Sequence, residues 1–499
     1  MAAEIEARPA APAGIEQNGI NVIREEERRG QPSGLFWPWF AANVSVLGVS
    51  YGSFLLGFGV SFWQATIAGV VGTVLSFLLV GYISLAGKRG SAPTMILSRG
   101  AYGVRGGALP TALSYILLVG WETVLVSLAT LATATVFSRL GAGGGNGTKI
   151  VAFLVVAGIV VVAGVFGFNL IMRLQTVLTI GLGILTVGYV LLTFQHIHLD
   201  KVGAVASGSW PAVLGALIFA ATGFGLGWVN TGGDYSRYLP RTSSGRGVVS
   251  WTTFGASIAP VILIVFGLLL AASDSKLNSA IASDPIGALT TILPTWYLVP
   301  FALVAIGGLI GGAVLDIYSS GLALLTLGLR TPRYIAAGID GVIMILGTIY
   351  VVWFASNFIG PFQGFLITLG VPIAAWCGVF LADLMARRRD YAEAELYDPA
   401  GRYGSVSWVA VGTTIVATFV GWGLVTNTFA QALSWQGYLL DPLHLGPRSG
   451  GPWSSANLGV LAAIVIGFAG QYAFGRAAVR RQENGSAVLT AEPRPGPTA

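Results

Sequence analysis

The chain has 499 residues, of which 27 are lysine or arginine and 21 are aspartate or glutamate. Charged residues make up 10% of the chain and hydrophobic residues 54%, whereas a soluble domain carries about 25% charged residues. Such a chain cannot cover a globular surface in water, so its composition argues against a soluble fold and indicates a polytopic membrane protein.

Long stretches without charge predict the membrane helices, since one span needs about 20 mostly apolar residues. Dividing these stretches by helix length gives about twelve helices. Continuous rather than alternating apolar runs argue against a transmembrane barrel. The predicted spans are 35–62, 64–86, 109–138, 150–168, 172–195, 208–230, 249–272, 297–328, 333–354, 358–384, 405–427 and 454–476.

The distribution of lysine and arginine predicts the orientation. With the N-terminus inside, most basic residues fall in cytoplasmic loops, as the positive-inside rule requires. Only Arg139, Lys149, Lys201, Lys276 and Arg448 fall on the other side. The net charge of +6 therefore needs no nucleic-acid partner. We expect a multi-pass protein of the cell (inner) membrane with both termini in the cytoplasm.

The two ends of the chain read as cytoplasmic tails without a packed core. They span residues 1–34 and 477–499 and are rich in proline, alanine, glycine, glutamate and arginine. The N-terminus lacks a basic segment followed at once by an apolar core, so no cleaved signal peptide is predicted.

The sequence offers little for enzymatic chemistry. It contains no phosphate-binding G-x-x-x-x-G-K-[ST] motif and no H-E-x-x-H motif. The single cysteine, Cys377, rules out a disulfide framework, and the three histidines fall in predicted loops, where they are usually solvated. We therefore expect no enzyme, no cofactor and no metal site. A secondary transporter is the leading interpretation, and a channel is a distant alternative, although no repeated filter sequence is present.

Two glycine-rich segments resemble the broken helices at which transporters built from inverted repeats bind substrate. One lies in the first predicted span and includes Gly48 and Gly52, next to Ser50; the other lies in the sixth and includes Gly225. Glycines also allow close helix packing, which is the alternative for each of them. Ser45, Ser50, Tyr51 and Ser53 are the first-helix side chains that could face such a site.

Three carboxylates fall inside predicted spans, where an ionised group is costly. They are Glu122, Asp316 and Asp340. Each could bind the coupling ion or the substrate, or could be a buried acid paired with a hydroxyl. Asp234 and Asp383 lie near arginines at predicted helix ends, and we expect ion pairs there.

Aromatic side chains on the same helices could stack against a flat ligand. Trp121, Phe224 and Trp228 occupy suitable positions, although most tryptophans and phenylalanines in such a chain face lipid.

Several blocks together resemble the nucleobase:cation symporters of the purine/cytosine permease type. They occur in family order across about residues 35–410. The blocks are GKRGSAPTMILSRGAYGVRGGALP (87–110), GWVNTGGDYSRYLP (227–240), IYSSGLALLTLG (317–328), SNFIGPFQGFLITLGVPIAAWCGVFLADLMARRRDY (356–391) and YGSVSWVAV (403–411).

The resemblance implies an all-α, LeuT-like fold of twelve helices. It places the first inverted repeat at 35–195, the second at 208–384 and two further helices at 405–476. It also implies that substrate binds between aromatics, with Trp121 and Phe224 at the matching positions, and that helix 8 contributes a polar residue near Asp316.

The chain departs from the family pattern at two places. The polar residue expected one turn from Trp121 is replaced by Leu118 or Leu125, and Glu122 is a neighbouring substitute. The hydroxyls that helix 8 supplies to sodium in sodium-coupled members are replaced by 307–312, GGLIGG. We therefore expect proton coupling through Asp316 or Glu122 rather than sodium coupling.

The predicted function is the import of a planar nucleobase, such as cytosine or a purine, by proton-coupled symport with alternating access. Uptake of allantoin, hydantoin or a vitamin-like heterocycle, coupled to either a proton or sodium, is the alternative within the same family.

Overall fold

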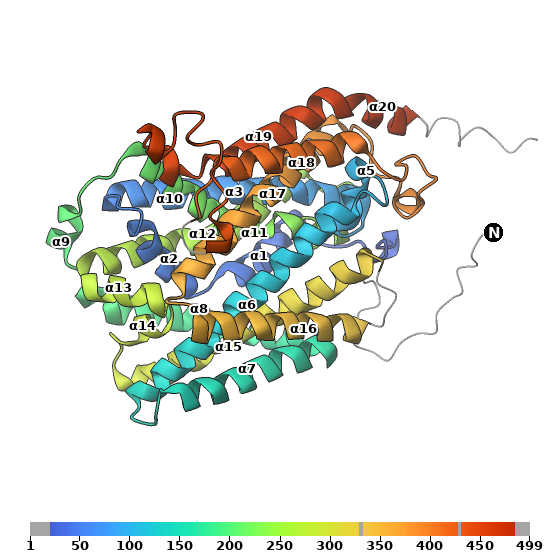
Figure 1. Ribbon diagram of the computed structural model, residues 1–499. Helices are drawn as coiled ribbons and strands as arrows, with labels where there is room; N and C mark the ends of the chain where they lie inside the picture. Colours follow the sequence, from blue (N-terminus) through green and yellow to red (C-terminus); the bar gives the residue numbers. More distant parts are fainter. Residues whose placement is uncertain (1–19, 167, 329–332, 428–430, 485–499) are drawn as a thin grey trace, which may run out of the picture.

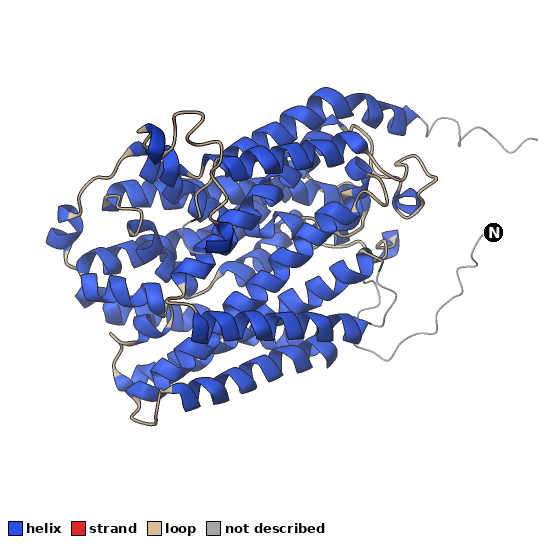
Figure 2. Ribbon diagram, in the orientation of Figure 1, coloured by secondary structure: helices blue, strands red, loops and turns tan. Residues whose placement is uncertain are grey.

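The protein is built from helices, as Figures 1 and 2 show for the computed structural model. The structure describes residues 20–166, 168–328, 333–427 and 431–484. All regular secondary structure in these residues is helical. This agrees with the predicted fold class, because a chain crossing a membrane must satisfy its backbone hydrogen bonds within each apolar segment.

The first five spans are α1 (Phe36–Asn43) with α2 (Leu47–Leu56), α3 (Phe62–Gly90), α6 (Ala108–Arg139), α7 (Asn146–Phe166) and α8 (Phe168–Thr193). The next five are α10 (Trp210–Gly223) with α11 (Gly225–Trp228), α12 (Gly245–Ser273), α15 (Thr295–Thr326), α16 (Arg333–Ile349) and α17 (Ile359–Ala386). The last two are α18 (Trp408–Gly423) and α19 (Leu458–Gly470).

Short helices lie between the spans and at their ends. The α-helical ones are α4 (Thr94–Leu97), α5 (Arg99–Tyr102), α9 (Leu199–Ala204), α13 (Ser275–Ser283), α14 (Gly287–Thr290) and α20 (Arg476–Asn484). The 3-10 turns are η1 (Glu25–Glu27), η2 (Pro32–Leu35), η3 (Phe194–His196), η4 (Val229–Thr231), η5 (Ser236–Tyr238), η7 (Glu393–Leu396), η8 (Gln431–Leu433), η9 (Pro447–Ser449) and η10 (Trp453–Ala456), and the π-helical turns are η6 (Tyr350–Phe354) and η11 (Gln471–Gly475).

The described helices follow the predicted order of spans. Ten of them are long and apolar enough to cross a membrane, and the pair α1 and α2 forms one further span bent by 67°. The apolar helix α18 is shorter and occupies the position of the eleventh predicted span. The predicted polytopic fold is therefore confirmed, and helix breaks occur in the first and sixth spans, where the glycine-rich segments suggested them.

The helices pack as two groups around the broken spans. α12 packs against α1, α2 and α3, and α15 packs against α6, α7, α8 and α16. The approach of α2 to α12 depends on glycine at both partners, because a Cβ on Gly52 would strike the backbone of Gly267 and one on Gly267 would strike the backbone of Val49. Gly52 is thus a packing residue, contrary to the prediction that it lines the binding site.

The two ends of the helix bundle differ in charge. We call the end that carries residues 20–35, the loops after α3, α11 and α17, and α20 the basic face; it is at the right in Figure 1. The other end, which carries α9, α13 and α14 at the left, is the opposite face.

The structure differs from the prediction of two unpacked tails. Ile23 and Arg28, in the predicted N-terminal tail, are buried, with exposed fractions of 2% and 6%. At the other end, residues 477–484 belong to α20, in which Val479 is buried. Residues 1–19 and 485–499 lie outside the described residues, so the prediction for them remains.

Candidate functional site

A cavity lies where the two broken spans meet. It is bounded by the break between α1 and α2, by the break between α10 and α11, and by one face each of α6 and α15. Its lining includes Asn43, Ser45, Gly48, Tyr51, Leu118, Trp121, Leu125, Thr179, Phe224, Trp228, Gly308, Gly312 and Asp316.

The breaks bring non-helical backbone to the cavity. At the first break, Val44 leaves helical geometry with ψ of 85°, and helix resumes at Leu47. At the second break, Phe224 has φ of −110° and ψ of −102°. The N–H of Gly225 is taken up by the Ser76 hydroxyl at 3.0 Å. Carbonyl and N–H groups left unpaired at such helix ends can bind a polar ligand.

Aromatic rings form two walls of the cavity. The rings of Tyr51 and Phe224 pack with centroids 4.4 Å apart. Trp121, on α6, is held edge-on by Phe362 and Phe365 of α17, at centroid distances of 5.7 and 6.1 Å. Rings presented from opposite helices can hold a planar heterocycle by stacking.

Asp316 is the acidic group of the cavity. It lies on α15, is 6% exposed and accepts no hydrogen bond from the described residues. A buried carboxylate without a partner is costly, so this side chain is suited to receive N–H donors of a ligand or a proton.

A second cavity continues from the first toward the basic face. Leu118, Trp228 and Asp316 line both cavities, which places Asp316 at their junction. Ile20, in the segment before α1, lines the outer part of the second cavity. The binding cavity therefore opens toward the basic face more nearly than toward the opposite face.

Packed side chains close the route to the opposite face. Phe362 contacts the rings of Tyr51, Phe54 and Phe219 at centroid distances of 6.0, 6.0 and 6.2 Å. All four rings are at most 3% exposed. The Ser50 hydroxyl donates to the Pro285 carbonyl at 2.7 Å, which fixes α2 to the loop before α14. Ser50 is therefore part of this closure and does not line the cavity.

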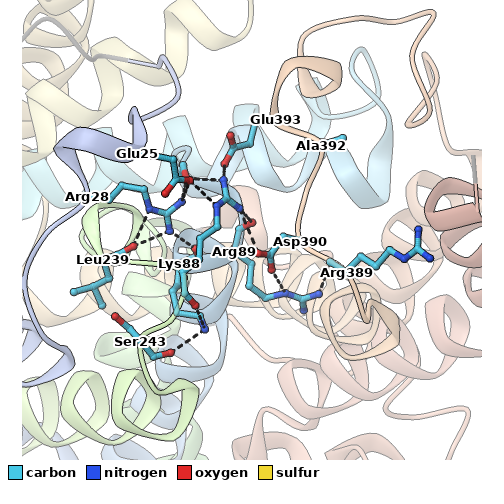
Figure 3. Close-up of polar contacts among 12 residues, drawn as sticks. Glu25, Arg28, Lys88, Arg89, Leu239, Ser243, Arg389, Asp390, Ala392 and Glu393 are labelled. Atoms are coloured by element: carbon cyan, nitrogen blue, oxygen red, sulfur yellow. Dashed lines mark hydrogen bonds and ion pairs between the residues drawn. The ribbon is translucent and has the colours of Figure 1, made fainter. Parts of the chain in front are cut away.

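An ion network ties the N-terminal segment to the basic face (Figure 3). Arg28 donates to the Leu239 carbonyl at 2.9 and 2.7 Å and to the Lys88 carbonyl at 2.5 Å. Arg241 pairs with Glu25 at 2.7 Å. The network continues from Arg241 to Asp390 and Glu393, and Arg89 also pairs with Asp390.

Two acids on the basic face have lowered pKa values because an arginine hydrogen bond favours the ionised form. Arg241 lowers the pKa of Glu25, and Arg402 lowers the pKa of Glu395. The pair Asp383–Arg387, expected from the sequence, is present at 2.6 Å, and Asp234 accepts hydrogen bonds from Thr94.

The cavity brings together five of the nine predicted site residues. Gly48, Trp121, Phe224, Trp228 and Asp316 line it. Ser50, Gly52, Gly225 and Glu122 do not.

These four residues lie outside the cavity for different reasons. Ser50 and Gly52 hold α2 in place, as described above. A Cβ on Gly225 would strike the backbone of α3 at Ser76, so this glycine serves packing. Glu122 points away from the cavity and accepts a hydrogen bond from Ser320. The structure does not place these four side chains in the cavity lining, so a binding role for them stays a prediction.

Asn43 and Thr179 also line the cavity and were not predicted from the sequence. The position of Asn43 just before a glycine-rich break was the available signal. Of the possible first-helix residues, Ser45 and Tyr51 line the cavity, whereas Ser53 donates to Asn278. In the described residues, no group of three or more histidine, cysteine, aspartate or glutamate side chains gathers as metal ligands would.

Comparison with known proteins identifies the family. The family described as "Permease for cytosine/purines, uracil, thiamine, allantoin" matches residues 22–440. The chain belongs to this family. It is therefore a multi-pass membrane transporter of small molecules and not an enzyme.

Individual relatives are distant but cover most of the chain. The cytosine permease of Escherichia coli (strain K12) is 25% identical over 71% of this chain and 77% of its own length. The Bacillus subtilis (strain 168) protein YxlA, for which purine-cytosine permease is a provisional name, is 24% identical over 83% of this chain and 89% of its own length.

Solved structures of the transporter Mhp1, of the nucleobase-cation-symport-1 family, share the fold. The closed form with bromovinylhydantoin bound matches with a TM-score of 0.65, 18% identity, and coverage of 94% of this chain and 99% of that one. The inward-facing form matches with a TM-score of 0.66 and 18% identity over 96% and 98% of the two chains. These similarities confirm the LeuT-like fold.

Proposed function

We propose that the protein imports a planar nucleobase, such as cytosine or a purine, together with a proton. The observation that carries this proposal is the cavity at the two helix breaks, with aromatic walls and the unpartnered carboxylate of Asp316. Its aromatic walls suit a flat ring, and its carboxylate suits the N–H edge of an aminopyrimidine or guanine.

In this proposal the basic face is cytoplasmic and the protein lies in the cell's inner membrane. The excess of lysine and arginine at that face supports the orientation. Substrate reaches the cavity from the opposite face when the rings around Phe362 separate. It stacks between Trp121 and Phe224, hydrogen-bonds Asp316 and the exposed backbone, and leaves through the second cavity.

Proton coupling is favoured over sodium coupling by the oxygen atoms near the cavity. Hard cations bind several oxygen ligands. On α15, the lining residues before Asp316 are Gly308, Leu309, Gly312 and Leu315, so the Asp316 carboxylate is the side-chain oxygen group that this helix brings to the cavity. The nearby acids can instead take up a proton.

Allantoin, a hydantoin or a vitamin-like heterocycle is the second candidate substrate. The family description names thiamine and allantoin, and one Mhp1 structure carries bromovinylhydantoin. A channel is less well supported, because packed rings close one side of the cavity.

A competition assay tests the proposed substrate class. Cells expressing the protein are given radiolabelled cytosine, with excess purines, uracil, allantoin, hydantoins or thiamine, and with or without a protonophore. We expect uptake that a subset of nucleobases blocks and that the protonophore abolishes. Uptake that no nucleobase blocks, or that only a hydantoin blocks, would contradict the proposed substrate.

A further inference from the structure

Three buried polar side chains meet outside the binding cavity, where α6, α15 and α16 pack together. The Ser320 hydroxyl oxygen lies 2.8 Å from Oε1 of Glu122 and 2.8 Å from Oδ2 of Asp340. All three side chains have an exposed fraction of 0%. The three helices contact one another pairwise, so the group sits at a sealed three-helix junction.

Counting protons at this junction shows that the two acids are not both ionised. A serine hydroxyl has one proton, and an ionised carboxylate only accepts hydrogen bonds. Ser320 can therefore donate to Glu122 or to Asp340, but not to both. The second contact of 2.8 Å needs a proton on a carboxyl, which then donates to the serine oxygen. The geometry fits one proton shared by the pair.

No cation among the described residues compensates two negative charges at this junction, where the Tyr115 phenol lies beside Asp340. Oε2 of Glu122 and Oδ1 of Asp340 are buried without a hydrogen-bond partner. Among the described residues, no lysine, arginine or histidine forms an ion pair with either acid. The other titratable groups facing the pair are the Tyr115 phenol of α6 and the Asp316 carboxyl of α15. α7, which packs against α16, presents Val161 there.

Two residues of the binding cavity, Trp121 and Asp316, are close neighbours of the junction along their helices. Glu122 directly follows Trp121, a cavity wall. Asp316 precedes Ser320 by one helical turn on α15, so the two side chains lie on the same side of that helix. Asp316 also lines the cavity that leads to the basic face. A ligand bound against Trp121 and Asp316 is thus in contact with the helix turns that carry the pair.

We propose that Glu122 and Asp340 share the coupling proton through Ser320, and that Asp316 serves the substrate. This inference rests on the proposed proton-coupled transport. On release, the O–H bond of the protonated carboxyl breaks, the proton passes by way of Asp316 to water in the basic-face cavity, and the pair gains one negative charge. Since that doubly charged state has no cation beside it, the pair takes up a proton again before the next cycle.

Purified protein in proteoliposomes separates coupling from substrate binding. Glu122→Gln, Asp340→Asn and the double variant are compared with the wild type in two assays. One assay is exchange of radiolabelled for unlabelled nucleobase without a gradient, and the other is accumulation driven by an inward proton gradient. Asp284→Asn is the control, because Asp284 is a partly buried acid on the opposite face that accepts from Thr135 and Gly287.

We expect the variants to keep exchange within about twofold while gradient-driven accumulation falls by about tenfold or more, the range of a typical coupling free energy. The control variant should keep both activities. Accumulation that persists in the double variant, or an equal loss of exchange and accumulation in all three variants, would overturn the inference.

Infrared spectroscopy gives a second readout that does not depend on transport. The wild type should show the C=O band of a buried protonated carboxyl that shifts in D₂O and is absent in the double variant. A band unchanged by both substitutions would overturn the shared proton. If the wild type showed this band but no nucleobase transport, the proposed function would fail while the shared proton stood.

Discussion

Replacing Phe362 with alanine should open the binding cavity toward the opposite face. Phe362 on α17 contacts Tyr51 and Phe54 of α2 and Phe219 of α10. Each such ring pair contributes about 0.5–1.5 kcal/mol beyond its burial. Allowing for relaxation of the neighbours, we expect a loss of about 1.5–3 kcal/mol across this closure. That corresponds to about a 10- to 100-fold rise in the open population.

Cysteine labelling measures this opening, because Cys377 is fully buried and should give little background. Ser45→Cys places a thiol in the cavity. A maleimide that cannot cross the membrane is added from outside, and Phe362→Ala should raise the labelling rate by about tenfold or more. Excess substrate should slow the labelling.

Phe358→Ala is the matched control, because Phe358 is also buried, lies directly before α17, and its ring stacks on that of Phe362. It should raise the labelling rate much less, since the ring contact between Phe358 and Phe362 does not join α17 to α2 or α10. Equal labelling in the two variants, or no increase in Phe362→Ala, would refute the assignment of Phe362 to the closure.

Three further predictions concern the cavity and the basic face. Asp316→Asn should weaken nucleobase binding by about 10- to 100-fold, since a hydrogen bond to a charged group contributes about 1.5–3 kcal/mol; an unchanged Kd in a tryptophan-fluorescence titration would contradict its role. Arg28→Ala should speed amide hydrogen exchange in residues 20–31, and Arg24→Ala, a surface change, should not. Glu25→Gln and Glu395→Gln should leave the pH profile of uptake between pH 5.5 and 8 unchanged. The pKa values of both glutamates are lowered in the folded protein. The stabilisation by their charge is therefore fully present above the ordinary glutamate pKa of about 4.5, and it is lost only as the pH falls through the lower folded pKa.

The fold could be predicted from the sequence because charge is so scarce. Gaps between charged residues located the spans, and their order agrees with the structure. Gaps between charged residues did not reveal the short helices α13 and α14, which lie between two spans. These two helices are too short to be recognised by apolar length, and they are held by contacts with α2 and α6. The gaps also missed the packing of residues 20–35, a mostly polar segment in which Ile23, Arg28 and Leu35 are buried.

The binding site was predictable in part. The aromatics and Asp316 stood out by residue type, but glycine has two uses that the sequence does not separate. Gly48 lines the cavity, whereas Gly52, one turn later, allows α2 to touch α12. Which side of a helix faces the cavity depends on tertiary packing. For the same reason the sequence did not reveal that Glu122 faces Asp340 across Ser320.

The most direct test of the account is accumulation of radiolabelled cytosine or purine by proteoliposomes under imposed gradients. We predict accumulation with an inward proton gradient in the absence of sodium, and its loss on addition of a protonophore. Accumulation that follows a sodium gradient at equal pH and ignores the proton gradient would contradict the account.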